Sequence, residues 1–413
     1  MKIAHFLWEF PPVIKGGLGT FGMELAQQQI IQNHHLTVFS LNEENKYDNF
    51  STWHKIEVYR PRLPDATEMF YLAANNELRN WGSYFRFFAD VMAYNFLSAD
   101  TLINTHIKSN NHDVDLLHAH DWLGILGGII AKKELQVPLL FHVHSTETGR
   151  SIGGGSSTVK EIEYMGGQAA DGIITVSHAM KEELITLGLP ENKIHVVWNG
   201  VDPTKYCMQA IIPEDIRKLR KKYDILPTET MLFFIGRLVT VKGADKLVQA
   251  MPQVIKEFPH TKLVILGIGD MEEDLQKQIN DLHLKDHVIL RNEFIDESER
   301  ILHYAASDIV ILPSLYEPFG IVCTEAMSMG KPVVVGARGT NGMREQVIPD
   351  GPGQCGVHVN SFDSEDIAWG IKEIMRQNDK GKRYGENGRK RVEKEFSWAM
   401  VAERIQNVYK LYT

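Results

Sequence analysis

The sequence predicts an α/β protein with two doubly wound domains, each built around a parallel β-sheet. Short apolar runs rich in β-branched residues alternate with longer helical patterns along most of the 413 residues. These runs are apolar on both faces, as expected of parallel strands that helices cover on each side. A chain of this length also exceeds the size at which a single hydrophobic core stops growing, so two domains are expected.

Two series of candidate strands follow one another along the chain. The first series is Ile3–Leu7, Leu36–Leu41, Leu116–Ala119, Pro138–His142, Gly172–Val176 and Ile194–Val197. The second series is Met231–Ile235, Lys262–Leu266, Val288–Leu290, Ile309–Leu312 and Pro332–Val335. Because each strand is joined to the next through a helical segment, we expect right-handed βαβ units.

The strand–helix alternation is interrupted after Asn199–Pro203, where a polar helical stretch runs to about Pro227. We therefore place the domain boundary near residue 203, which gives domains 1–203 and 204–395. The last stretch, 396–413, is predicted to be an amphipathic helix with Trp398, Val401, Ile405 and Val408 facing inward.

A second interruption is the insertion from residue 45 to about residue 110. Its aromatic run, WGSYFRFFADVMAYNFL, is predicted to be a helix. Aromatic residues at that spacing are typical of a packed core, and a binding platform is the alternative.

The composition excludes several classes of partner. The formal net charge of −9 argues against nucleic acid or an anionic membrane surface as the main partner. The basic run from Arg217 to Lys222 is interpreted as the solvated face of a helix. Three scattered cysteines form neither a disulfide framework nor a cysteine-based zinc site. With no signal-peptide pattern and no apolar stretch of about 18 residues, a cytoplasmic location is expected.

A literal G-x-G-x-x-G, formed by Gly17, Gly19 and Gly22, follows the first candidate strand. The two prolines before it form a loop rather than a strand-to-helix elbow, so the pattern is a weak signal for a dinucleotide. Glycine amides at the start of a helix still favour an anion. We therefore expect the backbone N–H groups of Gly16, Gly17 and Leu18 to bind phosphate at the mouth of a helix that begins near Gly19.

The second half contains its own candidates for anion binding. Gly236, Arg237 and Lys242 follow directly after a strand, where ligands bind in open α/β sheets. Arg237 can donate two hydrogen bonds to a phosphate, and Lys242 supplies a compact positive charge. Two surface cations in a solvated loop are the alternative. The next strand is also followed by glycines, of which Gly269 precedes a helix.

The segment LPSLYEPFGIVCTEAMSMGKPVVV carries two carboxylates around the start of a helix. Glu317 lies in the loop after a strand, Gly320 and Ile321 open the helix, and Glu325 lies further along it. Ionised carboxylates accept hydrogen bonds from the vicinal hydroxyls of ribose and hexose. One acid on each sugar, with phosphates between them, would suit a nucleotide sugar. The alternative is an acid placed for the helix dipole, with a second acid on the surface.

Two patterns could indicate a metal. Asp113-Val114-Asp115 is a literal D-x-D, but it precedes its strand and is interpreted as a turn. The pairs His118/His120 and His142/His144 alternate along strands, and we interpret them as residues beside a sugar site rather than as metal ligands.

At this point the motifs resemble a known family. Glu317-Pro318-Phe319-Gly320 with Glu325 resembles the E-x7-E signature of retaining glycosyltransferases with the GT-B fold, and Gly236-Arg237 with Lys242-Gly243 is similar to their G-R…K-G motif. LLHAHDW, the N-terminal glycine pair and NGVD are similar to glycogen and starch synthases. The fold that this implies is two Rossmann-like domains facing a cleft, with the last helix crossing back to the first domain.

The resemblance also implies roles for single residues. Arg237 and Lys242 would neutralise the departing diphosphate, and Glu317 would hold the hydroxyls of the donor sugar. The remaining donor contacts would come from Phe319, Gly320, Ile321 and Val322 at the helix start, from Glu325 at the ribose, and from His144 near the sugar. Asp121, Asn199 and Lys15 would lie on the acceptor side. Lys15 directly precedes Gly16, whereas common bacterial glycogen synthases have one spacer before the glycine pair, and they usually lack the second acid, which is Glu325 here. The chain therefore resembles the broader E-x7-E group, which includes archaeal-like glycogen synthases, more than the bacterial enzyme.

The implied activity is a retaining transfer of glucose from ADP-glucose or UDP-glucose to the non-reducing end of an α-glucan, with no metal and no cofactor. The alternatives are a glycosyltransferase with a small acceptor, such as glucose 1-phosphate, a sugar phosphate or a lipid, and a nucleotide-sugar isomerase or hydrolase on the same scaffold. The implied partners are the nucleotide sugar and a sugar acceptor. An oligomer is possible.

Overall fold

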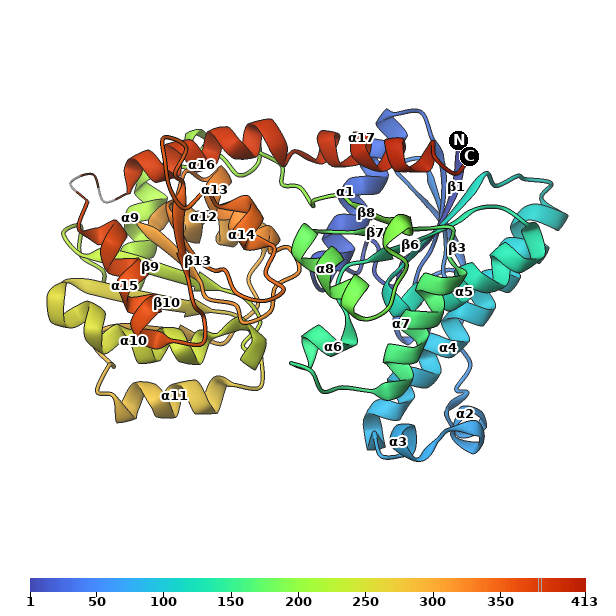
Figure 1. Cartoon of the computed structure of the whole chain (residues 1–413), viewed down its shortest axis with the longest axis horizontal. Helices are drawn as coiled ribbons and strands as arrows, with labels where there is room; N and C mark the ends of the chain where they lie inside the picture. Colours follow the sequence, from blue (N-terminus) through green and yellow to red (C-terminus); the bar gives the residue numbers. More distant parts are fainter. Residues whose placement is uncertain (378, 380) are drawn as a thin grey trace. The chain divides into compact units, whose positions relative to one another are not determined.

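Two separate β-sheets organise the chain in the computed structural model, which describes residues 1–377, 379 and 381–413 (Figure 1). One unit comprises Met1–Trp198 together with Trp398–Thr413, and the other comprises Asn199–Ser397. The division at Trp198–Asn199 lies a few residues before the predicted boundary at 203. The predicted α/β class with two parallel-sheet units is confirmed.

The sheet of the first unit has the strand order β3-β4-β2-β1-β5-β6-β7-β8. All its neighbouring strands are parallel except β3 and β4. The strands are β1 (Lys2–Phe6), β2 (His35–Phe39), β3 (Phe50–Trp53), β4 (Ile56–Tyr59), β5 (Leu116–His120), β6 (Leu139–Val143), β7 (Gly172–Thr175) and β8 (Ile194–Val196).

Helices cover both faces of this sheet (Figure 1). They are α1 (Gly17–Ile31), α4 (Phe85–Asp100), α5 (Asp121–Leu135), α6 (Glu147–Arg150), α7 (Ser157–Ala169) and α8 (His178–Thr186), and the last helix, α17 (Trp398–Tyr409), returns to this unit beside α1. The four apolar residues predicted to face inward on α17 are buried. The predicted crossing of the C-terminal helix back to the first unit is thereby confirmed.

The insertion at 45–110 contains elements that the sequence analysis did not predict. Strands β3 and β4 form an antiparallel hairpin that extends the sheet beside β2. His54 and Lys55 make its turn with positive φ angles of 47° and 70°, and neither residue type is a typical signal for such a turn. Two short helices follow, α2 (Thr67–Ala73) and α3 (Asn76–Arg79), and a π-helical segment (Thr101–Ser109) continues α4. The predicted aromatic helix is α4, and its side chains Phe85, Phe88 and Tyr94 are buried in the core.

The sheet of the second unit is parallel throughout, with the order β11-β10-β9-β12-β13-β14. Its strands are β9 (Thr230–Ile235), β10 (Thr261–Leu266), β11 (Val288–Arg291), β12 (Ile309–Leu312), β13 (Val333–Gly336) and β14 (Gly356–Val359), the last of which was not predicted. Its helices are α9 (Pro213–Lys222), α10 (Ala244–Glu257), α11 (Glu272–Asp281), α12 (Glu297–Ala306), α13 (Ile321–Ser328), α14 (Met343–Gln346), α15 (Ser364–Met375) and α16 (Lys382–Glu395).

Each sheet has a point where the strand order reverses direction. In the first unit the chain moves from β1 to β2 on one side and later to β5 and β6 on the other, and in the second unit β9 is flanked by β10 and β12. The carboxyl ends of strands at such a reversal form a crevice in which ligands bind in open α/β sheets. No helix in the described part of the chain is both long and apolar enough to cross a bilayer.

Candidate active site

The carboxyl ends of β9 and β12 bring Lys242 and Glu317 together. The Lys242 ammonium and the Glu317 carboxylate form a salt bridge, with 19% and 11% of their side chains exposed. Lys242 lies in the loop after β9 and Glu317 in the loop after β12, so the reversal of strand order makes them neighbours. The sequence predicted that each would bind the donor, but it gave no sign that they would pair with each other.

Backbone contacts fix the loop that carries Lys242. Gly243 follows it with φ = 69°, and a Cβ there would lie 2.1 Å from the carbonyl oxygen of Pro313. Only glycine therefore allows this loop to approach the β12 loop so closely. Leu315 also donates its N–H to the Val241 carbonyl at 2.8 Å, which joins the two loops directly.

Glu317 is held by the segment between β13 and α14. Its N–H donates to the Thr340 carbonyl at 3.1 Å, and its carbonyl accepts from Gly342 at 2.7 Å. Asn341, which is fully buried, donates to the Ser314 carbonyl at 2.8 Å and accepts from the N–H of Met343. The backbone of Glu317 is thus fixed by hydrogen bonds on both sides.

The start of α13 provides backbone donors beside Glu317. Gly320, with φ = 91°, is the residue before the helix, which begins at Ile321 and continues through Val322. The first turn contains no acidic side chain, and no side chain of the described residues caps the helix. The N–H groups of Ile321 and Val322 are therefore available to an anion or a hydroxyl, whereas Cys323 donates its N–H to the Gly320 carbonyl at 2.9 Å. Phe319 is buried, and its carbonyl accepts from the Gln346 amide at 2.6 Å.

Arg237 lies in the loop after β9 and is exposed. Within residues 1–377, 379 and 381–413 its guanidinium makes no hydrogen bond or ion pair. Its neighbour Gly236 donates its N–H to the Leu266 carbonyl at 3.1 Å. Gly269 has a packing role, because a Cβ there would lie 2.1 Å from the carbonyl oxygen of Leu238. The glycine lets the loop after β10 lie against the loop that carries Arg237.

Glu325 lies in a hydrogen-bonded cluster with residues that the sequence analysis did not identify. Its two carboxylate oxygens accept hydrogen bonds from the Tyr206 and Tyr304 hydroxyls, each at 2.8 Å. The Arg300 guanidinium lies 3.4 Å from the same carboxylate, which is 5% exposed. Burial and the nearby Glu325 charge raise the pKa of both tyrosines, so they remain hydrogen-bond donors at neutral pH. A ribose hydroxyl can reach this carboxylate only in competition with them.

The glycine loop of the first unit differs from its prediction in one respect. The Glu9 carboxylate accepts hydrogen bonds from the N–H groups of Lys15 and Gly16, at 3.0 and 3.1 Å. The Gly16 amide is therefore already occupied by an acid of the chain itself, and Gly17 and Leu18 in the first turn of α1 are what remains of the predicted anion site. Lys15 forms a salt bridge with Glu43.

The other glycines of the G-x-G-x-x-G pattern serve packing. A Cβ on Gly19 would lie 2.8 Å from the Glu9 carboxylate, and one on Gly22 would lie 2.9 Å from the Leu7 side chain. Because these two glycines have no Cβ, α1 can lie directly against the loop that follows β1. Helix α1 begins at Gly17, two positions before the predicted start.

Asp121 and His144 are brought together at the carboxyl ends of β5 and β6. The Asp121 carboxylate accepts the His144 N–H at 2.7 Å and that of Ser145 at 3.4 Å. Asp121 is buried and begins α5 with a positive φ of 51°. It therefore fixes the backbone at His144. Asn199 is also buried, and its side-chain oxygen lacks a hydrogen-bond partner among the described residues.

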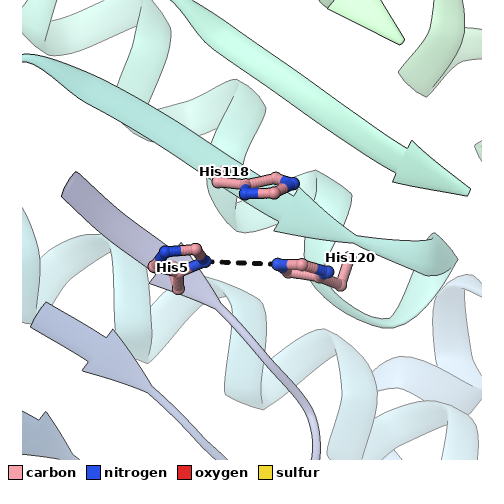
Figure 2. Close-up of side chains that lie close together, drawn as sticks. All are labelled: His5, His118 and His120. Atoms are coloured by element: carbon pink, nitrogen blue, oxygen red, sulfur yellow. Dashed lines mark hydrogen bonds between the residues drawn. The ribbon is translucent and has the colours of Figure 1, made fainter. Parts of the chain in front are cut away.

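Five histidines form an array along β1 and β5 and at the end of β6; four of them are buried and His144 is half-buried, and Figure 2 shows three of the five. His5 bonds to His120 at 3.3 Å, His118 to His142 at 3.3 Å, and His120 to His144 at 3.1 Å. Burial is the main cause that lowers the pKa of every ring, to about 4 for His5. The array is therefore uncharged at neutral pH. The alternation of histidines was visible in the sequence, but their pairing across strands was not.

The nitrogens of two histidine triads lie close enough to suggest metal ligands. In each of the groups His5/His118/His120 and His120/His142/His144, the candidate ligand atoms are within 4.8 Å of one another. The D-x-D has a different environment, because Asp113 pairs with the Lys2 ammonium at 2.9 Å and Asp115 accepts the Lys2 N–H at 2.7 Å. Both of these acids thus attach the turn before β5 to the start of β1.

Comparison with known proteins identifies the chain's relatives. Residues 215–391 match the family described as "Glycosyl transferases group 1", and residues 15–205 match "Glycosyltransferase Family 4". An uncharacterized glycosyltransferase of Methanocaldococcus jannaschii is 30% identical over 418 residues, covering 100% of this chain and 98% of the relative. A glycogen synthase of Mycobacterium tuberculosis is 29% identical, covering 99% and 94%, and an α-maltose-1-phosphate synthase of Mycolicibacterium smegmatis is 28% identical, covering 77% and 83%.

Solved structures share the fold over the whole chain. Sucrose-phosphate synthase from Thermosynechococcus elongatus superposes with a TM-score of 0.77 at 20% identity, covering 99% of this chain and 98% of that one. The catalytic domain of starch synthase IV from Arabidopsis thaliana, bound to ADP and acarbose, gives 0.75 at 18% identity, covering 99% of both chains. The fold is therefore GT-B, as the sequence motifs implied.

Proposed function

Because this chain belongs to the group 1 glycosyltransferases, we propose that it transfers glucose from a nucleotide-diphosphate glucose to the non-reducing end of an α-glucan. ADP-glucose is the favoured donor and UDP-glucose the second choice. The observation that carries the proposal is the pairing of Lys242 with Glu317 next to the start of α13 at the carboxyl ends of β9 and β12. Arg237, in the loop after β9, is exposed.

In this proposal Lys242 and Arg237 bind the diphosphate. Breaking the anomeric bond builds negative charge on the diphosphate, and fixed positive charges and N–H groups lower the energy of that state. Lys242 is already held by Glu317, so it needs little rearrangement when the donor arrives. Preorganised groups of this kind typically lower the barrier by about 3–4 kcal/mol each.

Glu317 has two tasks in the proposal. Without donor its carboxylate balances the Lys242 charge, and with donor it accepts hydrogen bonds from the sugar hydroxyls while the phosphates take over the lysine. The N–H groups of Ile321 and Val322 at the start of α13 add donors at the same place. Glu325 binds the ribose in place of one tyrosine hydroxyl.

The first unit is proposed to serve the acceptor and the donor sugar. His144 approaches the sugar, and Asp121 holds the backbone of His144 in position. The acceptor hydroxyl attacks from the side that the diphosphate leaves, which retains the anomeric configuration, and a departing phosphate oxygen takes the proton. This path requires no metal ion.

A small acceptor is the second candidate, and the likeness to an α-maltose-1-phosphate synthase favours it over a lipid acceptor. The two candidate functions use the same donor-binding residues and differ only in the acceptor whose hydroxyl attacks the anomeric carbon. Glucose 1-phosphate would bring a dianion to the acceptor side, and Lys15, which pairs with Glu43, is the cation that we propose for that side.

A donor and acceptor matrix tests the proposal. The full chain is incubated with ADP-, UDP- or GDP-glucose, each with glycogen, with glucose 1-phosphate or with no acceptor, and released nucleoside diphosphate is measured. The expected result is release from ADP-glucose that depends on glycogen, with new α-linkages seen by NMR. Release that needs glucose 1-phosphate instead selects the second candidate. No release from any donor, or release independent of acceptor, would contradict both.

A further inference from the structure

The buried histidines form two separate chains of hydrogen bonds that both start at Gln29. In the first chain the Gln29 side-chain oxygen bonds His5 Nε2 at 3.0 Å, and His5 Nδ1 bonds His120 Nε2 at 3.3 Å. His120 Nδ1 then bonds His144 Nε2 at 3.1 Å. Neighbouring ring planes along this chain differ by only 22° and 20°, so the rings meet edge to edge through their nitrogens.

The second chain runs from the other atom of the same amide. Gln29 Nε2 donates to the Tyr409 hydroxyl at 2.9 Å, and that hydroxyl lies 2.7 Å from His118 Nδ1. His118 Nε2 bonds His142 Nδ1 at 3.3 Å, with ring planes only 9° apart. His142 Nε2 is buried and has no partner among the residues that the structure describes.

The direction of each bond follows from the Gln29 amide. A side-chain carbonyl can only accept, so His5 Nε2 must carry the proton that it receives. A neutral imidazole has one donor and one acceptor nitrogen, so His5 Nδ1 is bare and accepts from His120 Nε2–H. By the same step His120 Nδ1 is bare and accepts from His144 Nε2–H. One amide thus determines the proton positions on three rings.

We propose that this chain of hydrogen bonds, beginning at Gln29, holds His144 in the tautomer that carries its proton on Nε2 and leaves Nδ1 as a bare acceptor. The other four rings are buried, and His144 is the half-buried member of the array. Gln29 is accordingly a positioning residue, which acts on His144 through two other histidines.

The use of this tautomer rests on the proposed function. A bare Nδ1 accepts a hydrogen bond from a hydroxyl of the donor sugar, whereas the opposite tautomer would present an N–H there. The low pKa values keep the ring uncharged, so it does not repel the positive charge that grows on the sugar as the anomeric bond breaks.

The proton positions can be measured without any donor. The full chain is labelled with ¹⁵N-histidine, and long-range ¹H–¹⁵N spectra at pH 7.5 report which nitrogen of each ring carries the proton. His144 is assigned by a His144→Gln variant. The expected result is a single neutral Nε2–H form for His144. The Nδ1–H form, or a mixture of both, would overturn the proposal whether or not the protein transfers glucose.

A matched pair of variants tests the role of Gln29. Gln29→Met removes both ends of the amide, and Gln27→Met makes the same change two positions earlier on α1, where the side chain is half-buried. Only Gln29→Met should convert His144 to a mixture of tautomers and lower kcat about 10-fold, the effect of one neutral hydrogen bond. KM for the donor should change less than kcat.

A second variant keeps the test open if Gln29→Met does not fold. Tyr409→Phe removes the acceptor of Gln29 Nε2 and leaves the amide free to rotate, so a mixture is expected at His144 again. A pure Nε2–H form in every folded variant would show that Gln29 does not set the tautomer. Stoichiometric zinc in the purified protein, lost in a His120→Gln variant, would also overturn the proposal, because a metal would take the lone pairs that the chain uses.

Discussion

In the first unit uncharged histidines are buried on the central strands β1, β5 and β6, whereas in the second unit a charged pair lies in the loops that follow β9 and β12. His5 bonds to His120, and His118 bonds to Tyr409 and His142, all through neutral hydrogen bonds. Lys242 and Glu317 instead balance opposite charges at a similar place in their own sheet, the carboxyl ends of the strands. Under the proposed function, a neutral array would tolerate a cationic sugar nearby, and a paired cation would be ready to bind a diphosphate. Two sheets of the same fold class thus hold polar groups in different ways, one by hydrogen bonds between neutral rings and the other by an ion pair.

Acid should have the strongest effect, because lowering the pH protonates the neutral histidines of the first unit and destabilises the folded protein. The pKa of His5 is lowered from 6.5 to about 4, so between these pH values the unfolded chain binds a proton that the folded chain does not. Stability from this group is complete above pH 6.5 and is lost as pH falls toward 4, by roughly 3 kcal/mol. Three other array histidines have pKa values shifted far in the same direction.

Urea unfolding at pH 7, 6 and 5 measures this loss. The Glu163 carboxyl acts in the opposite sense, because burial raises its pKa to about 7 and protonation there favours the folded state. The histidines outnumber this one glutamate, so the unfolding free energy should decrease as the pH is lowered. A His5→Gln variant should flatten the slope by up to about 1.4 kcal/mol per pH unit. An equally steep slope in that variant would mean that His5 is not held neutral.

The next prediction concerns the Lys242–Glu317 pair of the second unit, which a substitution of the lysine removes. Lys242→Ala should lower turnover of the donor by about 100-fold or more, because the departing diphosphate loses a fixed cation. Lys246→Ala is the matched control on α10, where the lysine lies 3.8 Å from Asp245 on a more exposed surface. Initial rates at saturating donor compare the two. Equal rates in both variants would remove Lys242 from the leaving-group role.

A smaller effect concerns the glycine that brings the two loops of the pair together. Gly243→Ala should lower the unfolding free energy by about 1–3 kcal/mol, because it adds a Cβ at positive φ against the Pro313 carbonyl. Gly339 also has a positive φ, but an added Cβ there would meet open space. Gly339→Ala therefore measures the cost of the positive φ without a clash. Thermal unfolding of the two variants measures the difference. If Gly243→Ala lowers the unfolding free energy no more than Gly339→Ala does, the two loops can move apart to accommodate the added Cβ.

The smallest effect is expected at the D-x-D. Asp113→Asn removes an exposed contact to Lys2, so activity should stay within about twofold of the wild type, with or without a chelator. Rates measured with EDTA and with added Mg²⁺ check this. A large loss in the variant together with rescue by metal would mean that these acids bind a cation after all.

The fold and the order of the motifs could be predicted because they depend on local patterns. Apolar runs and helical periodicity located the central strands, and the rule for open parallel sheets placed Arg237, Lys242 and Glu317 after strand ends. The hairpin β3–β4 was missed because His54 and Lys55 form its turn without glycine or asparagine. Strand β14, which is short and begins with Gly356, was also missed.

The partners of the predicted site residues could not be predicted because the tertiary fold chooses them. Nothing near Glu325 in the sequence indicates that Tyr206 would donate to it, since more than a hundred residues separate them. Glu9 took the amide expected to bind phosphate, and Gln29 and Tyr409 came from opposite ends of the chain to the histidine array. Residue types indicated the chemistry, but the network of contacts needed the structure.

The central claim is that the second unit binds the donor through its diphosphate. Calorimetric titration with ADP, AMP and adenosine tests it most directly, using the wild type, Arg237→Ala and Lys246→Ala. ADP should bind at least about 10-fold more tightly than AMP, and Arg237→Ala should remove most of this difference while Lys246→Ala leaves it intact. Equal affinity for ADP and AMP in the wild type, or a full ADP preference in Arg237→Ala, would contradict it.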